Sequence, residues 1–160
     1  MTFDRIDRQI LSLLQEDGRM TNVELAERVG LTAPPCLRRV RALEEAGAIR
    51  GYHAALDPRL LGFTITVFAL VSLKSQAGSD LAAFEAHIAT IPEVRECHML
   101  NGEIDFLLKI VAADLERFQS MLTTQLITAP NVASVKTSPT VRTSKALPGI
   151  PVSTESVPVA

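Results

Sequence analysis

The stretch "LTAPPCLRRVRALEEAGAI", residues 31–49, carries the arginines Arg38, Arg39 and Arg41 just after the prolines Pro34 and Pro35. A guanidinium group presents a rigid fork of donors that fits phosphate oxygens and the edges of bases. Nine of the twelve arginines fall in the first 60 residues, whereas all four lysines fall in the remainder. Because the net charge of the chain is -2, any attraction to nucleic acid has to come from this local group.

The same stretch has the pattern of an amphipathic helix that begins with its prolines, which are tolerated where backbone N–H groups have no partner within the helix. Its apolar face is formed by Cys36, Leu37, Val40 and Leu43. Arg38 lies in the middle of the opposite arc. Cations near a helix N-terminus oppose the helix dipole, so the arrangement favours an anionic partner such as a phosphate backbone. The alternative is a solvent-exposed face on which Arg41 pairs with Glu45.

Two shorter helices are predicted before this one. The apolar residues of the first, which ends near Gly18, are Ile6, Ile10, Leu13 and Leu14. Thr21 and Glu24 form the pattern of a capping box at the start of the second, which Gly30 ends. Thr32 is in position to cap the third helix. Short helices joined by the turn at residues 30–32 predict a helix-turn-helix, whose later helix enters the major groove of DNA.

This motif assigns roles to the polar residues around the turn. The predicted DNA-binding residues are Thr21, Asn22, Thr32, Pro34, Pro35, Arg38, Arg39 and Arg41. The two prolines and Arg38 are expected at base edges. Thr21, Asn22 and Arg39 are expected at phosphates. Double-stranded DNA is therefore the predicted macromolecular partner.

A repeated motif organises the second half of the chain. Its copies are Asp80-Leu81-x-x-Phe84 with Asp114-Leu115-x-x-Phe118, and Thr90-x-Pro92-x-Val94 with Thr128-x-Pro130-x-Val132. Each copy predicts a helix capped by aspartate, with leucine and phenylalanine facing a sheet, followed by a proline stop and a strand. Apolar runs at residues 65–73 and 106–111 predict a strand before each helix.

The resulting order β-α-β-β-α-β predicts a ferredoxin-like domain with both helices on one face of an antiparallel sheet. The fold class is α+β, with an N-terminal winged helix-turn-helix domain and a C-terminal ferredoxin-like βαββαβ domain. Asn101-Gly102 predicts a type I′ hairpin between the central strands. The first strand is apolar on both faces, as Val67 and Phe68 show, so the face away from the helices needs a cover. A second copy of the chain would supply it, and the alternative is the chain's own tail.

The turn "DPRLLG" and the change in composition near the end divide the chain into a helix-turn-helix domain at residues 1–56, a linker at 57–62, a ferredoxin-like domain at 63–145 and a tail at 146–160. The run from Ile49 to Leu56 is β-like and interrupted by Gly51, which predicts a wing or an extended connector. The tail is rich in proline, serine and threonine, which predicts an arm or a disordered segment.

Several function classes are not indicated. Cys36 and Cys97 stand outside any C-x-x-C pair, and the neighbours Cys97 and His98 would point to opposite faces of a strand, so neither a disulfide nor a metal site is expected. The chain lacks a phosphate-binding loop, a dinucleotide fingerprint and a Ser-His-Asp order, so no cofactor and no catalytic residue is expected. Without a signal peptide or a membrane-length apolar run, a cytoplasmic protein is expected, with no membrane partner.

The phrase "ELAERVGLTAPPCLRRVRALEEAGAI", the connector "RGYHAALDPRLLG" and the later "GEIDFLLK" together resemble the leucine-responsive regulator/AsnC group, also called feast/famine regulators. The resemblance covers about residues 3–145. It implies a transcription regulator whose N-terminal domain binds DNA and whose C-terminal domain pairs subunits and senses a small molecule, usually an amino acid. It also implies a homodimer that assembles further into an octamer.

By this resemblance, the effector lies between neighbouring dimers beside a Gly-x-x-Asp turn. The implied effector-binding residues are Asn101, Gly102, Glu103, Ile104 and Asp105. Backbone N–H groups of the turn can meet a ligand carboxylate, and Asp105 can meet its ammonium. The alternative for Asp105 is a strand-end carboxylate satisfied by local donors. The chain has Asn101 where serine or threonine is common, and Phe106 where an aromatic hydroxyl is common, so the ligand is left open.

Two other functions compete with an effector-responsive regulator. A sirohaem decarboxylase resembles the two-domain fold and would use groups such as Arg95 and His98 around propionates, but the arginine-bearing helix would then have no purpose. An architectural DNA-binding protein without effector sensing is the second. We therefore predict a sequence-specific regulator and no enzyme.

Overall fold

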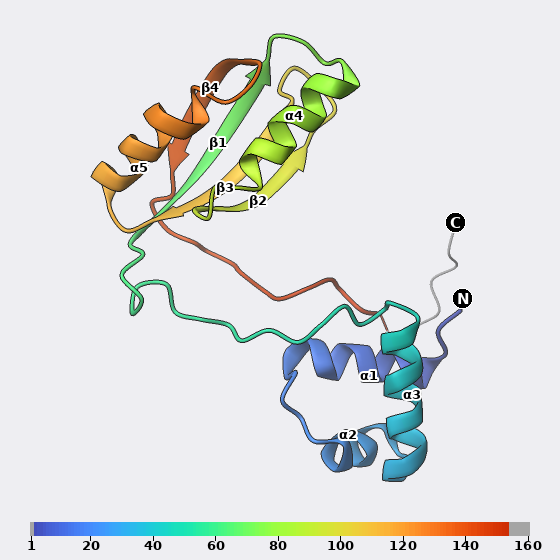
Figure 1. Ribbon diagram of the computed structural model, residues 1–160. Helices are drawn as coiled ribbons and strands as arrows, with labels where there is room; N and C mark the ends of the chain where they lie inside the picture. The colour runs from blue at the N-terminus through green and yellow to red at the C-terminus, as the bar shows by residue number, and fades with distance from the viewer. Residues whose placement is uncertain (1, 154–160) are drawn as a thin grey trace. The chain divides into compact units, whose positions relative to one another are not determined.

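The computed structural model describes residues 2–153, and the chain forms two compact units (Figure 1). Of the described residues, the N-terminal unit contains those at 2–55 and 145–153, and the C-terminal unit is Leu56–Ser144. Among the described residues, no helix combines the length and the apolar character that a bilayer crossing requires.

The helices of the N-terminal unit are α1 (Arg5–Glu16), α2 (Asn22–Val29) and α3 (Ala33–Glu45). The predicted capping box opens α2, because Thr21 and Glu24 each accept a hydrogen bond from the backbone N–H of the other. Gly30 ends this helix in the left-handed conformation, with a φ of 73°. The buried residues between the helices are Ile10, Leu25, Ala26, Val29, Cys36 and Leu43. The helix-turn-helix prediction is confirmed, although Leu37, predicted on the buried face, lies at its edge and is 38% exposed.

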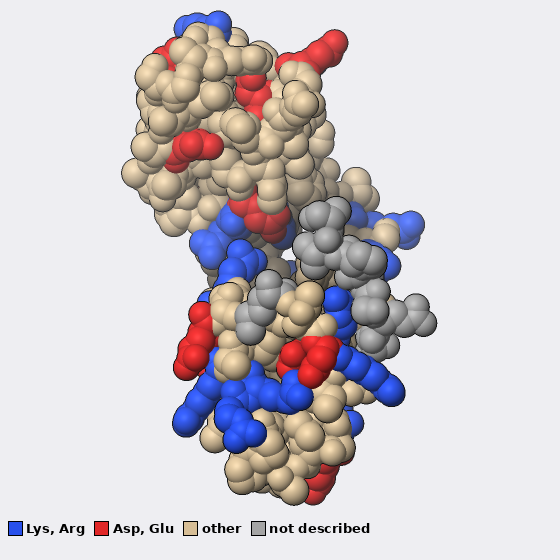
Figure 2. Space-filling model, turned by 90° about the vertical axis from the view of Figure 1, so that its right-hand side faces the viewer, with Lys and Arg blue, Asp and Glu red and all other residues tan. Residues whose placement is uncertain are grey.

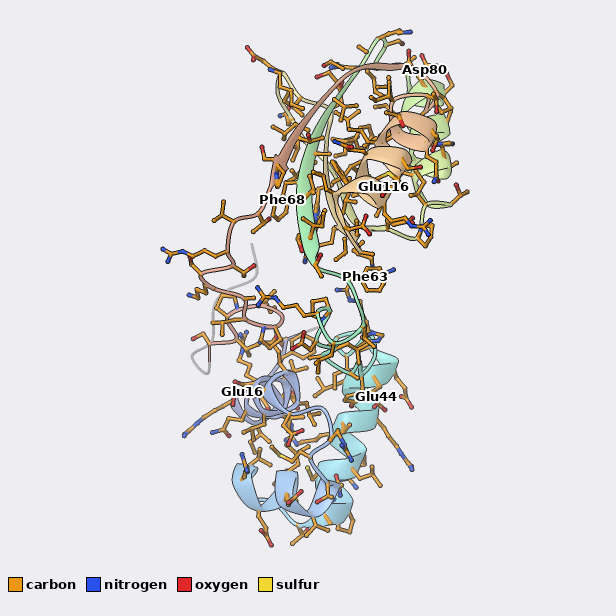
Figure 3. All side chains as sticks on the ribbon, turned by 90° about the vertical axis from the view of Figure 1, so that its left-hand side faces the viewer. Glu16, Glu44, Phe63, Phe68, Asp80 and Glu116 are labelled. Carbon is orange, nitrogen blue, oxygen red and sulfur yellow. The ribbon has the colours of Figure 1, made fainter. Side chains whose placement is uncertain are left out.

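Residues 49–56 form an extended connector in which no strand is assigned. Tyr52 holds the connector to α3, because its hydroxyl donates a hydrogen bond to Glu44 Oε1 at 3.0 Å. Figure 3 labels Glu44 on this helix. Burial and the hydrogen bond to Glu44 raise the pKa of Tyr52 to about 12.

The first part of the tail docks on α1. The Gln15 side chain donates to the Ile150 carbonyl at 2.7 Å and accepts from the Ile150 N–H at 3.0 Å. Gly149 has a φ of 65°, and a β-carbon there would overlap the Gln15 carboxamide, so the contact depends on glycine. Arg8 donates a longer bond to the Ser153 carbonyl, at 3.5 Å. The remainder of the predicted arm, residues 154–160, lies outside the described residues.

The C-terminal unit has the predicted element order. Its elements are β1 (Ile65–Leu73), α4 (Gly78–Ile88), β2 (Val94–Met99), β3 (Phe106–Ala112), α5 (Leu115–Met121), the π-helical turn η1 (Leu122–Leu126) and β4 (Val132–Pro139). The strands form an antiparallel sheet in the order β2-β3-β1-β4. Helices α4 and α5 cover one face of it (Figure 1). The ferredoxin-like prediction is confirmed.

Side chains alternate between the two faces of the sheet along β1. The residues of this strand that are buried beneath the helices are Val67, Ala69, Val71 and Leu73. Phe68 is 38% exposed and points away from the helices (Figure 3). We call this second side the open face; its apolar members by register are Phe68, Leu70, Leu107 and Val111. A polar chain crosses it, because Glu96 contacts Lys109 Nζ at 2.7 Å and His98 Nε2 at 3.2 Å.

The structure corrects three details of the repeated motif and the hairpin. Asp114 caps α5, but Asp80 caps nothing: α4 begins earlier, at Gly78, and Asp80 is its third residue. Leu115 does not face the sheet, because it is the first residue of α5 and is 55% exposed. The connection between β2 and β3 spans residues 100–105, and Asn101 has no positive φ, so the type I′ turn is wrong while the pairing of these strands is confirmed.

Tyr52 is the only tyrosine of the chain, so ultraviolet absorbance follows its ionisation directly. We expect the Tyr52 phenol of the folded protein to ionise with a pKa of about 12, above the pKa of about 10 for a free tyrosine. The fold favours the neutral phenol, so this stabilisation is complete below pH about 10 and is lost as the pH rises through the folded pKa. In Glu44→Gln the pKa falls toward the free value, because the nearby charge is removed. An unchanged titration in Glu44→Gln contradicts the contact.

Candidate nucleic-acid interface and effector turn

Helix α3 presents two arginines without internal partners. Arg38 and Arg41 are exposed, and neither makes a hydrogen bond or an ion pair with any described residue. Arg41 in particular forms no ion pair with Glu45 within the described chain. In Figure 2, basic side chains project into solvent from the lower body, which is the N-terminal unit, with acidic side chains beside them. The two guanidinium groups are therefore available to an external anion.

Thr32 does not cap α3, contrary to the prediction. A capping side chain accepts from the N–H of the second or third helical residue. These positions are Pro34 and Pro35, which have no N–H. The Thr32 side chain consequently makes no capping bond and is exposed, as Pro34 is, whereas Pro35 is half-buried. The prolines thus leave a hydroxyl group free at the start of the recognition helix.

Arg39 has partners inside the N-terminal unit. Its Nη1 lies 2.7 Å from Asp4 Oδ2 and 2.7 Å from Asp7 Oδ1, two carboxylates at the start of α1. The backbone hydrogen bond from Asp7 and the side-chain bond from Arg39 lower the pKa of Asp4. The two side-chain hydrogen bonds raise the pKa of Arg39. A phosphate at Arg39 would compete with both carboxylates, so this residue fixes α3 against α1 in the free protein.

Asn22 and Thr21 are also engaged within the motif. The Asn22 Nδ2 donates to the Ala33 carbonyl at 2.8 Å, which ties the start of α2 to the start of α3. Its Oδ1 is buried without a partner and, being an acceptor, cannot bind a phosphate oxygen. The Thr21 hydroxyl donates to Glu24 Oε2 at 2.7 Å. Both residues position the helix-turn-helix, and phosphate contact is left to the second Nδ2 hydrogen and to the backbone.

Two basic residues outside the predicted set lie close to this motif. Arg5 of α1 and Arg28 of α2 are exposed and line one cleft of about 640 Å³ together with Gln9 and Gly30. Neither arginine makes a hydrogen bond to a described residue. Because phosphate contacts depend on charge rather than on base identity, these side chains suit the backbone of a duplex. In the sequence, the position of Arg28 just before the turn was the one feature that could have indicated a phosphate contact. No sequence feature indicated such a role for Arg5.

The candidate effector turn lies between β2 and β3. Asn101, Gly102 and Glu103 are exposed and Ile104 is half-buried. Gly102 has a φ of 155°, a conformation that only glycine adopts readily. The backbone N–H groups of Gly102, Glu103 and Ile104 make no hydrogen bond to another described residue. They are the kind of donors that a ligand carboxylate can use.

Asp105 is held more tightly than a free ligand group would be. It is only 6% exposed. Its Oδ2 accepts from the Leu73 N–H at 2.7 Å, and its Oδ1 accepts from Gln76 Nε2 at 2.8 Å. Its own N–H donates to the Val71 carbonyl at 3.0 Å. In a single subunit these local donors satisfy Asp105, which thereby anchors the turn to the end of β1, and a ligand ammonium would share the carboxylate with them.

The cysteines and histidines form no metal-binding group. Cys36 is buried in the N-terminal core, and burial raises the pKa of its thiol. Cys97 is more exposed than Cys36, but partial burial of its sulfur, followed by the nearby Glu85 carboxylate, also raises the pKa of its thiol. His98 contacts Glu96 on the open face instead. Within residues 2–153, no cluster of three or more His, Cys, Asp or Glu side chains could hold a metal ion.

Comparison with known proteins accounts for both units. Residues 3–50 match the winged helix-turn-helix DNA-binding family, and residues 66–150 match the Lrp/AsnC ligand binding domain. A leucine-responsive regulatory protein of Rhizobium meliloti is 54% identical over 142 residues, which cover 89% of this chain and 91% of that protein. The chain belongs to the Lrp/AsnC family. It is a transcription regulator with a DNA-binding unit and a ligand-binding unit, and the resemblance noted in its sequence is confirmed.

Other Lrp/AsnC proteins are similar over most of their length. The Bkd operon transcriptional regulator of Pseudomonas aeruginosa is 44% identical over 135 residues, covering 84% of this chain and 88% of that protein. The structure of a transcriptional regulator of Neisseria meningitidis in complex with L-Met is 37% identical, with a TM-score of 0.89, and the match covers 94% of this chain and 97% of that one.

Replacement of Arg39 should destabilise the N-terminal unit in a pH-dependent way. We expect Arg39→Ala to lower the free energy of unfolding by about 1 kcal/mol at neutral pH, the upper range for partly exposed ion pairs. The pKa of Asp4 is lowered from 3.8 in the folded state, so its contribution is present above 3.8 and is lost as the pH falls through the folded value. Urea unfolding at several pH values measures the difference, which should vanish at the acid end.

Arg38→Ala is the matched control for this experiment, because Arg38 is exposed on the same helix and has no described partner. Its unfolding free energy should stay within about 0.5 kcal/mol of the unmodified protein at every pH. If Arg38→Ala and Arg39→Ala lose stability equally, the ion pairs with α1 do not hold the helix.

Proposed function

We propose that this Lrp/AsnC protein contacts base edges with Thr32, Pro34 and Arg38 and a phosphate with Arg41, while Asn22, Thr21 and Arg39 mainly hold the motif in shape. The observation that carries the assignment is that Arg38 and Arg41 are exposed and have no partner among the described residues. A helix in the major groove contacts base edges with residues near its N-terminus. Arg38 is the candidate for a guanine, because arginine donates two parallel hydrogen bonds to that base.

We further propose that an amino acid is the effector and that it binds at residues 101–105. The complex of the similar Neisseria meningitidis regulator with L-Met supports this ligand class. The free backbone N–H groups around Gly102 support a site for its carboxylate. Gln76 and Asp105, which share a hydrogen bond of 2.8 Å, are the polar side chains that we assign to its ammonium.

We also propose a homodimer formed through the open face, and we take its further assembly to an octamer from the family resemblance alone. A sheet face that carries Phe68, Leu70 and Leu107 exposes apolar surface that a second copy would remove from water. The other predicted cover, the chain's own tail, is bound to α1 through Gln15 as far as it is described. We place the protein in the cytoplasm, where a regulator of this kind meets its operators.

DNA binding tests the reading residues directly. In fluorescence anisotropy with an operator fragment, Arg38→Ala should weaken binding by about 1–3 kcal/mol and relax base preference at one position. Arg41→Ala should weaken binding to all DNA sequences by a similar factor and reduce the dependence of that binding on salt concentration. Arg117→Ala, an exposed arginine of α5, is the control and should bind as the unmodified protein does.

The same titration is repeated with each of the twenty amino acids. At least one amino acid should shift the affinity for the operator. Glu103→Gln should change that shift while leaving the affinity for DNA in the absence of amino acids unchanged. Equal affinity with and without every amino acid would identify an architectural DNA-binding protein. No binding to any duplex at low salt would refute the proposed function as a whole.

Substitution on the open face tests the dimer. Phe68→Asp should shift the equilibrium toward monomers by at least about tenfold, because two carboxylates would be buried in one interface. Leu115→Asp is the control, since Leu115 is an exposed apolar residue on α5. Sedimentation velocity gives the masses. An unchanged mass for Phe68→Asp means that subunits associate elsewhere.

A further inference from the structure

A second cleft lies within the C-terminal unit, away from the effector turn. It has a volume of about 320 Å³, which is within the range of small-molecule sites. Its apolar walls come from Leu56, Pro58, Leu61, Phe63, Pro92 and Val111. Figure 3 labels Phe63 just before β1. Strand β2 begins at Val94, beside the cleft, and ends at Met99, just before the turn at residues 101–105. The cleft and the turn therefore lie near opposite ends of this strand, which is roughly 16 Å long.

The segment that forms one wall is folded back on itself. The Phe63 N–H donates to the Pro58 carbonyl at 2.8 Å, and the Leu61 N–H donates to the same carbonyl at 3.1 Å. Leu61 and Phe63 are nevertheless 58% and 41% exposed. The wall is therefore a defined turn that presents apolar side chains to the cleft.

Glu93 places an unsatisfied oxygen at this cleft. Its Oε2 is buried and has no hydrogen-bond partner among the described residues. Its backbone is fixed, because its carbonyl accepts from the Val111 N–H at 2.9 Å. A buried carboxylate oxygen without a donor is costly, and such groups in native proteins call for a specific explanation. A cationic donor in the cleft would remove that cost.

Arg95 supplies the opposite charge. It lies at a β-bulge, where the pairing of β2 with β3 shifts between Val94 and Glu96, and bulges re-aim side chains. The Arg95 Nη1 donates to the Pro92 carbonyl at 3.2 Å. No ion pair joins Arg95 to Glu93 in the described chain. The cleft thus has an acceptor and a donor group that do not neutralise one another.

We propose that this cleft binds a small amphiphile with an apolar body and a primary ammonium group, the chemistry of an apolar amino acid. The ammonium meets Glu93, the apolar body lies against Leu61 and Phe63, and a carboxylate, where present, meets Arg95. Leu56–Phe63 is the first segment of the C-terminal unit, so an occupant would hold this segment beside β2 and β3. The site goes beyond the effector turn and does not depend on it.

Calorimetric titration of the full chain with three probes tests the proposal. The probes are 3-methylbutylamine, L-leucine and 4-methylpentanoate, which share an apolar body and differ in their charged groups. We expect the amine to bind and the acid not to bind. Glu93→Gln, which keeps the shape, should weaken the amine by about tenfold or more, as expected for a charge-assisted bond. Arg95→Gln should weaken L-leucine but leave the amine unchanged.

Glu103→Gln in the effector turn is the matched control and should bind the amine normally. Leu61→Trp adds a second readout, because the chain has no other tryptophan: its fluorescence should change with the amine, and Glu93→Gln in that background should abolish the change. Amine affinity that is unaffected by Glu93→Gln overturns the proposal, as does failure of every probe, which is the result for a cleft closed by a second copy. Loss of L-leucine binding only in Glu103→Gln overturns it while leaving the proposed effector turn intact.

Discussion

The contact of Arg39 with Asp4 and Asp7 is the interaction on which the DNA-binding surface depends. Three arginines stand together on α3, and on charge alone they are equivalent. The two carboxylates at the start of α1 take up Arg39 at 2.7 Å and so fix the rotation of α3 about its axis. Arg38 and Arg41 are then left on the outer side, with no anionic partner among residues 2–153. One neutralised arginine thereby defines where the two free ones point.

Much of the fold could be predicted because its determinants are local. The strand at residues 65–73 was visible as an apolar run, and β1 has those bounds. The repeated Asp-Leu-x-x-Phe motif located both helices of the ferredoxin-like unit. It failed in detail at Asp80 and Leu115, because helix ends fray and the first residue of a helix is not fixed by one capping residue alone. The predicted type I′ turn at Asn101 was wrong for a different reason. Asp105 anchors a longer connection between β2 and β3 to the end of β1, and this contact joins residues far apart in the chain.

The residues of the candidate DNA-binding site could be predicted from the sequence, but the side chains that they contact within the protein could not. The outward face of α3 followed from helical periodicity, but the pairing of Arg39 with Asp4 joins residues far apart in the chain. Burial of the Glu93 oxygen likewise arises only when the strands assemble. The free hydroxyl of Thr32 is different, because it could have been deduced from the sequence. Two consecutive prolines at the second and third helical positions leave a capping residue with nothing to cap.

The bond between Gln15 and Ile150 has a topological consequence. Because residues from both ends of the chain belong to the N-terminal unit, the backbone leaves that unit once near residue 56 and re-enters it near residue 145. The unit is therefore attached at two points rather than one. A domain joined through two connecting segments has less conformational freedom than a domain joined through one flexible linker, because the two segments close a loop. A recognition helix carried in this way loses less orientational entropy when it meets its operator.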